Sequence, residues 1–211
     1  KTYYKADFIA ATMSTELSST SKLREFVEEL KKLNIEIVNP SINKSFPDFR
    51  AIDGKIFYGL GAIKNVGFEA ISNIVNEREN NGKFKSFSDF INRVDSKDVN
   101  KLQLEGLTKA GAFDELNEDR AKIYNSIPKI IQKIKNINDD KINNQSSLFG
   151  NSENQDNEFE FAPSSSWKQK EVLSEEFKSL GFYISNHPLN EYKKIFNQLK
   201  IITYDNFLSI E

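Results

Sequence analysis

The 211-residue sequence contains no cysteine and only one histidine, His187. The absence of cysteine excludes disulfide bonds, thiolate metal sites and a cysteine nucleophile, and it permits a reducing, cytoplasmic compartment. One histidine cannot supply a histidine metal cluster or, with no second base, a catalytic triad, so we read His187 as the neighbour of a helix break. No apolar run reaches the roughly 18 residues of a membrane span. Membrane and metal functions are therefore not expected.

The sequence also lacks an excess of positive charge, since the net charge is −2 and the isoelectric point is about 5.7. The distribution is uneven. Residues 54–135 carry 14 basic and 11 acidic side chains, whereas residues 136–176 carry 3 and 9. A mildly basic region followed by an acidic one is compatible with a localised nucleic-acid surface. The chain opens on Lys1-Thr2-Tyr3 without an initiator Met, which we read as a piece of a longer protein.

Apolar residues at helical spacing predict a mainly α fold. A short strand at residues 35–38 and a β-hairpin around Asp53-Gly54 are the predicted exceptions, because Asp-Gly between two apolar runs is a strong hairpin signal. A run at residues 201–208 alternates like the first strand of a further domain. The predicted helices cover residues 5–13, 23–33, 68–80, 100–107, 120–135, 167–180 and 190–198, and a further short helix begins at residues 86–91.

A tight bend at Ile63–Gly67 joins an apolar helical turn to the helix that begins at Phe68. Such a bend needs residues that tolerate positive φ, which here are Gly67 and, second, Asn65. Backbone N–H groups at the start of a helix lack intrahelical partners and can bind a phosphate without reading a base. Lys64, Asn65, Val66 and Gly67 are the candidate contacts, and a packing corner without a ligand is the alternative.

A second helix, bend and helix follow about 45 residues later, with Gly111 and Ala112 in the bend and Asn117 or Asp119 as the cap of the next helix. Two such units in tandem resemble helix-hairpin-helix modules, which grip the DNA backbone. Gly111 and Ala112 are the expected backbone contacts, and Lys101 and Lys109 the expected basic side chains.

Residues 136–166 are rich in Asn, Asp, Ser, Gln and Glu, a composition that predicts a flexible, acidic linker. Gln145, Leu148 and Phe149 interrupt it as a short motif that could bind a partner. The pair Asp139-Asp140 is the only tempting carboxylate pair, and we do not expect it to hold a catalytic metal.

Five phrases carry a resemblance to a known family. They are residues 36–43, Tyr58–Lys64, Leu104–Leu107, Ala110–Asp114 and Leu180–Leu189. In this order they resemble the alpha subunit of bacterial DNA polymerase III, a C-family replicative polymerase and nucleotidyltransferase. The resemblance implies that residues 1–45 end the fingers domain, that 46–135 are a tandem helix-hairpin-helix domain, and that 136–166 are the linker. Residues 167–211 would then be helices leading into a nucleic-acid-binding barrel.

The same resemblance implies binding partners for this segment and implies that it has no catalytic residues. The partners are duplex DNA, other replicase subunits and a sliding clamp bound by Gln145, Leu148 and Phe149, with the fragment itself monomeric. The family's catalytic carboxylates and their Mg²⁺ lie in the palm, upstream of Lys1, so no catalytic, metal or cofactor residue is expected here.

Three departures from the family pattern bear on these expectations. Ser41 stands where the family often has Asp, Asn65 replaces the first hairpin glycine, and the bend at Gly111 lacks a second glycine. Two other functions remain open, a protein-interaction scaffold that uses these hairpins only for packing, and an independent nuclease or repair enzyme. The sequence offers no metal-ligand cluster for the latter.

Overall fold

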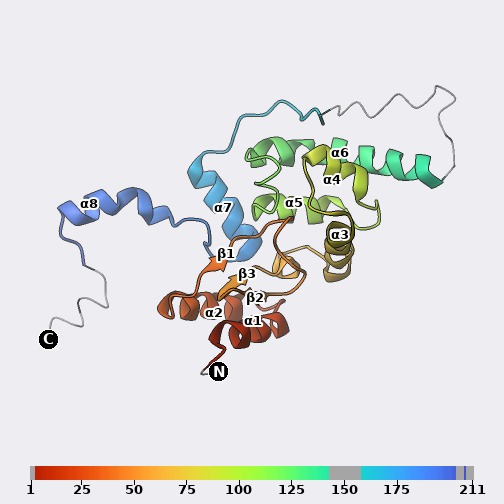
Figure 1. Cartoon of the computed structure of the whole chain (residues 1–211). Helices are drawn as coiled ribbons and strands as arrows, with labels where there is room; N and C mark the ends of the chain where they lie inside the picture. Colours follow the sequence, from red (N-terminus) through yellow and green to blue (C-terminus); the bar gives the residue numbers. More distant parts are fainter. Residues whose placement is uncertain (1–2, 143–157, 203–206, 208–211) are drawn as a thin grey trace.

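The computed structural model describes residues 3–142, 158–202 and 207, and within these ranges the chain is mainly helical (Figure 1). The fold class predicted from the sequence is confirmed. The eight α-helices of the described residues are α1 (Lys5–Thr15), α2 (Thr20–Lys32), α3 (Phe68–Asn81), α4 (Phe87–Arg93), α5 (Lys101–Lys109), α6 (Arg120–Ile142), α7 (Gln169–Leu180) and α8 (Lys193–Gln198).

A three-stranded sheet lies against α1, in the order β1 (Ile37–Val38), β3 (Lys55–Phe57), β2 (Arg50–Ile52). The predicted hairpin is confirmed: β2 and β3 pair antiparallel, and the turn between them places Asp53 at φ 51° and Gly54 at φ 75°. Positive φ at both central residues gives the turn whose twist matches that of the strands. The predicted strand at residues 35–38 supplies β1, which pairs parallel with β3.

One continuous hydrophobic core runs from Ala6 in α1 to Phe182 after α7. Its centre is a group of buried phenylalanines whose rings meet edge to face, with Phe90 lying 5.2 Å from Phe84 and 5.1 Å from Phe113 between ring centroids. Residues on either side of the domain boundaries expected near 45 and 135 therefore share a core, and the boundaries themselves stay a prediction.

The corner at residues 39–45 has a structural role. Ser41 is buried and its hydroxyl accepts the N–H of Asn43 at 3.2 Å. The Asn43 side chain bonds both the carbonyl and the N–H of Phe84 at 2.9 Å. The Arg78 guanidinium donates to the carbonyls of Ile42 and Ser45, and its burial lowers the pKa of Arg78. Ser41 therefore stabilises the corner itself, while Asn43 and Arg78 link the corner to the loop before α4 and to α3.

The prediction that residues 136–166 form a flexible linker is wrong at both ends that the structure describes. Helix α6 continues to Ile142, and Lys141 Nζ donates to the carbonyl of Asn92 at 3.0 Å. On the other side, Phe159 is only 4% exposed and its N–H donates to Ser88 Oγ at 2.7 Å. Phe159 finds apolar cover on α4 and α6, which composition could not reveal. Gln145, Leu148 and Phe149 lie outside the described residues.

Gly111 and Arg120 form the polar centre of the second bend. Gly111 has φ +80°, and a Cβ atom there would lie 2.2 Å from Nη2 of Arg120. That guanidinium donates to both carboxylate oxygens of Asp114, at 2.8 and 2.6 Å, and to the carbonyl of Lys109 at 3.0 Å. A glycine is therefore required twice, for the backbone conformation and for the space that Arg120 fills.

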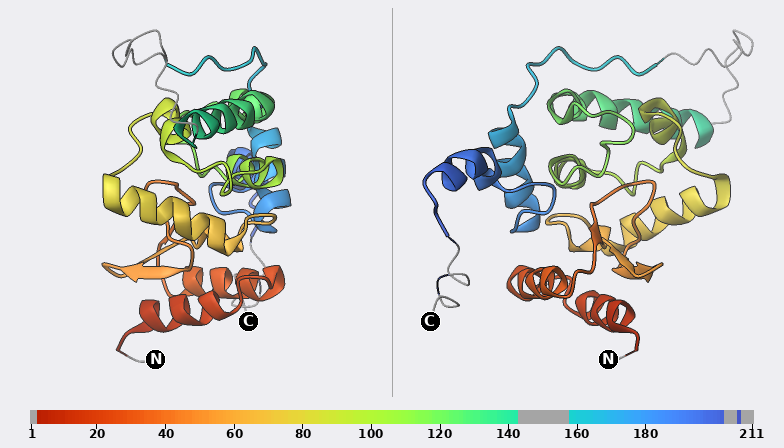
Figure 2. Two further views of the ribbon diagram at one scale, coloured as in Figure 1. Left: turned by 90° about the vertical axis from the view of Figure 1, so that its right-hand side faces the viewer. Right: turned by 60° about the vertical axis from the view of Figure 1, so that its left-hand side comes forward.

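The segment after α7 ends in an arm that leaves the body of the molecule (Figure 2). The 3₁₀-helix η2 (Pro188–Tyr192) and α8 contain no buried residue. His187 caps η2, since its Nδ1 accepts the N–H of Leu189 at 3.2 Å. Ile201 and Ile202 belong to no strand, so the strand predicted from residue 201 does not begin there.

Replacing Phe159 with alanine is expected to lower the free energy of unfolding by about 3 kcal/mol, because a buried ring leaves a cavity. Urea denaturation of the full chain measures this. Glu160→Ala is the matched control, since its side chain is 94% exposed and should leave the midpoint unchanged. Equal midpoints for Phe159→Ala and the wild type would mean that this segment does not stabilise the core.

Gly111→Ala and Gly54→Ala both place alanine at positive φ, which costs about 1–2 kcal/mol at either position. Nothing lies within 4 Å of a Cβ at Gly54, whereas at Gly111 the new methyl displaces Arg120 from Asp114. We expect Gly111→Ala to lose about 2 kcal/mol more than Gly54→Ala, as charged hydrogen bonds are broken. Thermal and urea unfolding of the pair give the comparison, and identical losses would show that Arg120 relocates freely.

Candidate nucleic-acid interface

The first bend is left-handed at Asn65, which has φ 64°, and not at Gly67, which has φ −77° and ψ 132°. The prediction of positive φ is therefore correct for Asn65 and wrong for Gly67. Gly67 is the residue directly before α3, and a residue at this position takes an extended conformation that any amino acid can adopt. A 3₁₀-helix, η1 (Leu60–Ala62), leads into the bend.

The start of α3 is open to solvent. No side chain accepts the N–H groups of its first turn, and Asn65, Gly67, Phe68 and Glu69 are all exposed. These groups have no intrahelical partner and lie at the positive end of the helix dipole. The exposed Lys64 adds a positive charge at the same bend. This is the geometry of an anion site that needs no base contact.

Not every predicted donor of this bend is available. The N–H of Lys64 donates to the carbonyl of Ser179 at 3.1 Å, and the N–H of Val66 donates to the carbonyl of Ile63 at 3.1 Å. The Val66 side chain is buried. Lys64 can therefore contribute its ammonium group and Val66 only packing, while the amides of Asn65, Gly67 and Phe68 have no acceptor among the described residues.

Helix α5 packs against the bend through Gly106 and Gln103. A Cβ atom at Gly106 of α5 would lie 2.6 Å from the carbonyl oxygen of Lys64, and one at Gly67 would lie 3.3 Å from Nε2 of Gln103. The starts of α3 and α5 are therefore neighbours. Lys101, the first residue of α5, is exposed and only 3.9 Å from Glu105 as a loose ion pair. Of the predicted residues, Lys64, Asn65 and Gly67 lie together at the bend, and Lys101 begins the helix that packs against it.

The second bend does not repeat this arrangement. Gly111 and Ala112 are buried, and their N–H groups donate to the carbonyls of Thr108 and Leu107. The prediction that they contact DNA through their backbone is therefore contradicted, because these donors are spent inside the fold.

The N–H groups at the start of α6, after the second bend, also have acceptors within the chain. Asp119 Oδ1 accepts the N–H groups of Ala121 at 3.1 Å and Lys122 at 3.2 Å, while Ser166 donates to Oδ2 at 2.5 Å. Burial opposes ionisation of this carboxyl, but these hydrogen bonds outweigh burial and lower the pKa of Asp119. A carboxylate of the chain itself occupies the position that a phosphate could take at α6.

Lys109 is likewise committed within the molecule. Its Nζ lies 3.3 Å from Glu175 Oε2 and 5.0 Å from the centre of the Tyr124 ring. Burial would lower the pKa of Lys109, but the Tyr124 hydroxyl and the Glu175 carboxylate raise it above its usual value. The expected phosphate contact by Lys109 does not fit this position, since the charge is already neutralised.

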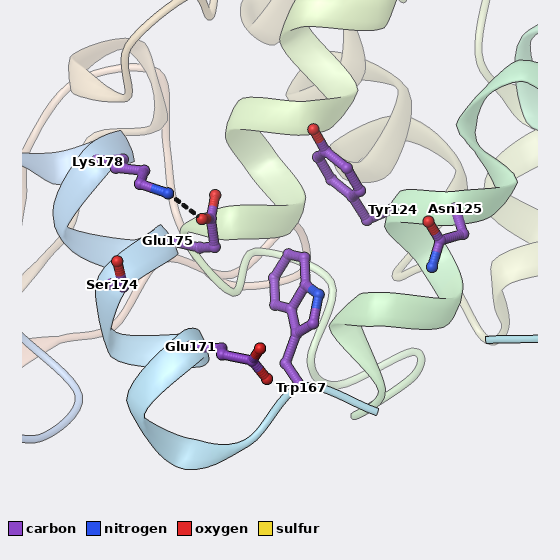
Figure 3. A pocket seen from close by; sticks show the side chains of 7 residues that line it. All are labelled: Tyr124, Asn125, Trp167, Glu171, Ser174, Glu175 and Lys178. Atoms are coloured by element: carbon purple, nitrogen blue, oxygen red, sulfur yellow. Dashed lines mark hydrogen bonds and ion pairs between the residues drawn. The ribbon is translucent and has the colours of Figure 1, made fainter. Parts of the chain in front are cut away.

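A hollow of about 420 Å³ opens between α6 and α7 next to Lys109 (Figure 3). Trp167 and Tyr124 face it with ring centroids 5.5 Å apart, and Glu175 pairs with Lys178 at its edge. Glu171 also lines it. Sequence reasoning missed this hollow because residues more than 40 positions apart form it. Lys109 and Lys178 both pair with Glu175 here, so these lysines are already engaged within the chain.

Neither metal binding nor membrane insertion finds support in the described part of the chain. No group of three or more His, Cys, Asp or Glu side chains there is placed to hold a metal ion. No helix of the described residues is long and apolar enough to cross a bilayer. Asp139 and Asp140 lie in the last turns of α6, where they are partly or fully exposed.

Comparison with known proteins agrees with this geometry. Residues 34–123 match the helix-hairpin-helix motif family. The DNA polymerase III subunit alpha of Borreliella burgdorferi is 39% identical over 209 residues, 96% of this chain and 18% of that protein. Those of Campylobacter jejuni and Caulobacter vibrioides are each 36% identical, over 100% and 88% of this chain and 18% and 16% of their own lengths. The chain spans less than a fifth of each of these three relatives. It is therefore a homologue of one segment of the DNA polymerase III alpha subunit family.

Proposed function

We propose that this chain is a non-catalytic segment of a replicative DNA polymerase III alpha subunit and that it binds the backbone of duplex DNA without sequence preference. The observation that carries the proposal is the exposed, uncapped start of α3 directly after the left-handed Asn65, inside the helix-hairpin-helix match. DNA-templated synthesis and its Mg²⁺ would belong to other segments of such a cytoplasmic enzyme. Other replicase subunits would be its partners, and the segment would be monomeric.

Binding would rest on backbone amides, with lysine side chains in support. The N–H groups of Asn65, Gly67 and Phe68 would donate to phosphate oxygens, and Lys64 and Lys101 would add charge on either side. Phosphate contacts of this kind fix the register of a protein on the duplex and carry no sequence information. Each neutralised phosphate releases counterions, so affinity should fall as salt rises.

The second bend would support this grip from within. Asp119 fills the start of α6, and Gly111 and Ala112 are buried, so the bend would stabilise α5 and α6 beneath the first bend instead of holding a second phosphate. The proposed DNA contact would therefore be made by the first bend and not by the second. A protein-interaction scaffold without DNA binding remains the alternative, and the DNA measurement below separates the two.

We also propose that Gln145, Leu148 and Phe149 bind the sliding clamp. The support is the motif itself and its place between the helix-hairpin-helix match and α7, where the resembling family keeps such a motif. Leu148 and Phe149 would bury apolar surface in a pocket of the clamp, and Gln145 would hydrogen-bond at its edge and set the register.

Gly67→Asp is expected to lower the affinity for duplex DNA by at least about tenfold, because it places a carboxylate at the start of α3 as Asp119 does at α6. Aspartate is favoured in this position, so the free energy of unfolding should change by only a few tenths of a kcal/mol. Fluorescence anisotropy with two duplexes of unrelated sequence, over a series of salt concentrations, measures binding by the full chain.

Gly67→Asn separates the charge from the capping, since its amide oxygen can accept the same N–H groups without a negative charge, so it should bind DNA more tightly than Gly67→Asp but more weakly than the wild type. Wild-type affinity in Gly67→Asp would place the DNA elsewhere. No salt-dependent binding by the wild-type chain would favour the scaffold alternative.

The double variant Leu148→Ala, Phe149→Ala should bind the purified sliding clamp at least about tenfold more weakly, because each side chain would contribute about 2 kcal/mol of apolar burial. Isothermal titration of the full chain should give micromolar affinity for the wild type, in keeping with a short linear motif. Leu189→Ala, at an exposed leucine of η2, controls for general loss of apolar surface. Unchanged affinity of the double variant would end the proposal.

A further inference from the structure

Helix α7 lies outside the residues that match the helix-hairpin-helix family, yet it contacts both bends. Glu175, Glu176 and Ser179 project toward them from neighbouring positions on one side of the helix. Glu175 pairs with Lys109, Glu176 Oε2 lies 3.8 Å from Arg120 Nη1, and Ser179 bonds the first bend. Figure 2 shows α7 running along the ends of the hairpin helices.

Ser179 links the first bend to helix α5. Its side chain is 4% exposed, and its hydroxyl donates to the carbonyl of Gly106 in α5 at 3.0 Å. Its own carbonyl accepts the N–H of Lys64 at 3.1 Å. Gly106 and Lys64 themselves approach closely. One residue of α7 therefore forms hydrogen bonds to the backbone on both sides of this contact.

The orientation of α7 is itself fixed by a buried carboxylate. Glu176 has no exposed surface, and its Oε1 accepts the N–H groups of Ile184 at 2.8 Å and Ser185 at 3.1 Å. Its Oε2 accepts the hydroxyl of Ser185 at 2.5 Å. Gly181, at φ +84°, turns the chain back so that these groups can reach Glu176. The rotation of α7 that brings Ser179 to the bend is therefore locked at the next turn of the same helix.

We propose that Ser179 is a positioning residue for DNA binding, acting through the Lys64–Gly67 bend; the inference rests on the proposed function. The Ser179 carbonyl accepts the N–H of the Ile63–Lys64 peptide, and the Ser179 hydroxyl anchors that carbonyl to α5. The peptide one residue before the left-handed Asn65 is thereby fixed, and the amides of Asn65 and Gly67 would keep one arrangement. A bend that is ordered before DNA arrives loses less conformational entropy on binding. Ser179 touches no phosphate in this arrangement.

Ser179→Ala removes the hydroxyl bond to Gly106 and is expected to weaken duplex binding by the full chain about three- to tenfold, the value of one buried hydrogen bond. Hydrogen exchange at the Lys64 amide should accelerate by a similar factor, while amides inside α3 and α5 exchange as before. Ser179→Thr keeps the hydroxyl and should restore both values. Ser174→Ala, on the exposed side of α7, should change neither.

The outcomes separate the inference from the function on which it rests. If the wild-type chain does not bind duplex DNA, the proposed function fails, and so does the positioning role. If Ser179→Ala speeds exchange at Lys64 but binds DNA as well as wild type, the proposed function stands and the positioning role is overturned. Uniformly faster exchange throughout α3, α5 and α7, not rescued by Ser179→Thr, would show a purely structural residue and also overturn it.

Discussion

The first backbone N–H groups of a helix have no partner within the helix, and this constraint separates the two bends of the molecule. At α6 the chain satisfies them with Asp119, whose carboxylate accepts two amides and whose pKa is lowered by those bonds. At α3 the residue in the same position is Gly67, which has no side chain to offer. Two similar sequence patterns thus give one self-satisfied helix start and one that can accept an anion. The difference is a single side chain at the residue before the helix.

The local pattern predicted the elements well because periodicity and turn chemistry act over a few residues. The Asp53-Gly54 turn and the left-handed Asn65 both follow from residues that tolerate positive φ. The failures share another cause. Phe159 lies in a polar segment, but it is buried because Ser88, Phe87 and α6 receive it. In the sequence Lys109 is a candidate phosphate contact. In the structure Glu175, 66 positions later, pairs with its ammonium group. Such partners are invisible to any window on the sequence.

Gly106 is a glycine inside a helix whose role becomes clear only from the three-dimensional structure. A glycine inside a helical pattern lowers helix stability, and it often marks a close backbone approach. Here the approach is that of the Lys64 carbonyl, which a Cβ at Gly106 would meet at 2.6 Å. The first bend can therefore rest directly on α5, and Gln103 comes to Gly67 by the same contact. A glycine in a helix is compatible with such a contact but does not identify the partner, because nothing near residue 106 points to residue 64.

The physical unit that presents the first bend is larger than its sequence motif. The helix-hairpin-helix match ends at residue 123, but Lys109, Arg120 and the Lys64 amide all meet side chains or carbonyls of α7. The carboxylate of Glu176 is buried and supplied with donors from the chain that follows α7, an arrangement that is stable only when every partner is present. A cut between residues 123 and 169 would leave Arg120 without Glu176 and the Lys64 amide without an acceptor. The bend keeps its shape because α7 completes it, so the boundary of the folded unit follows the hydrogen bonds and not the motif.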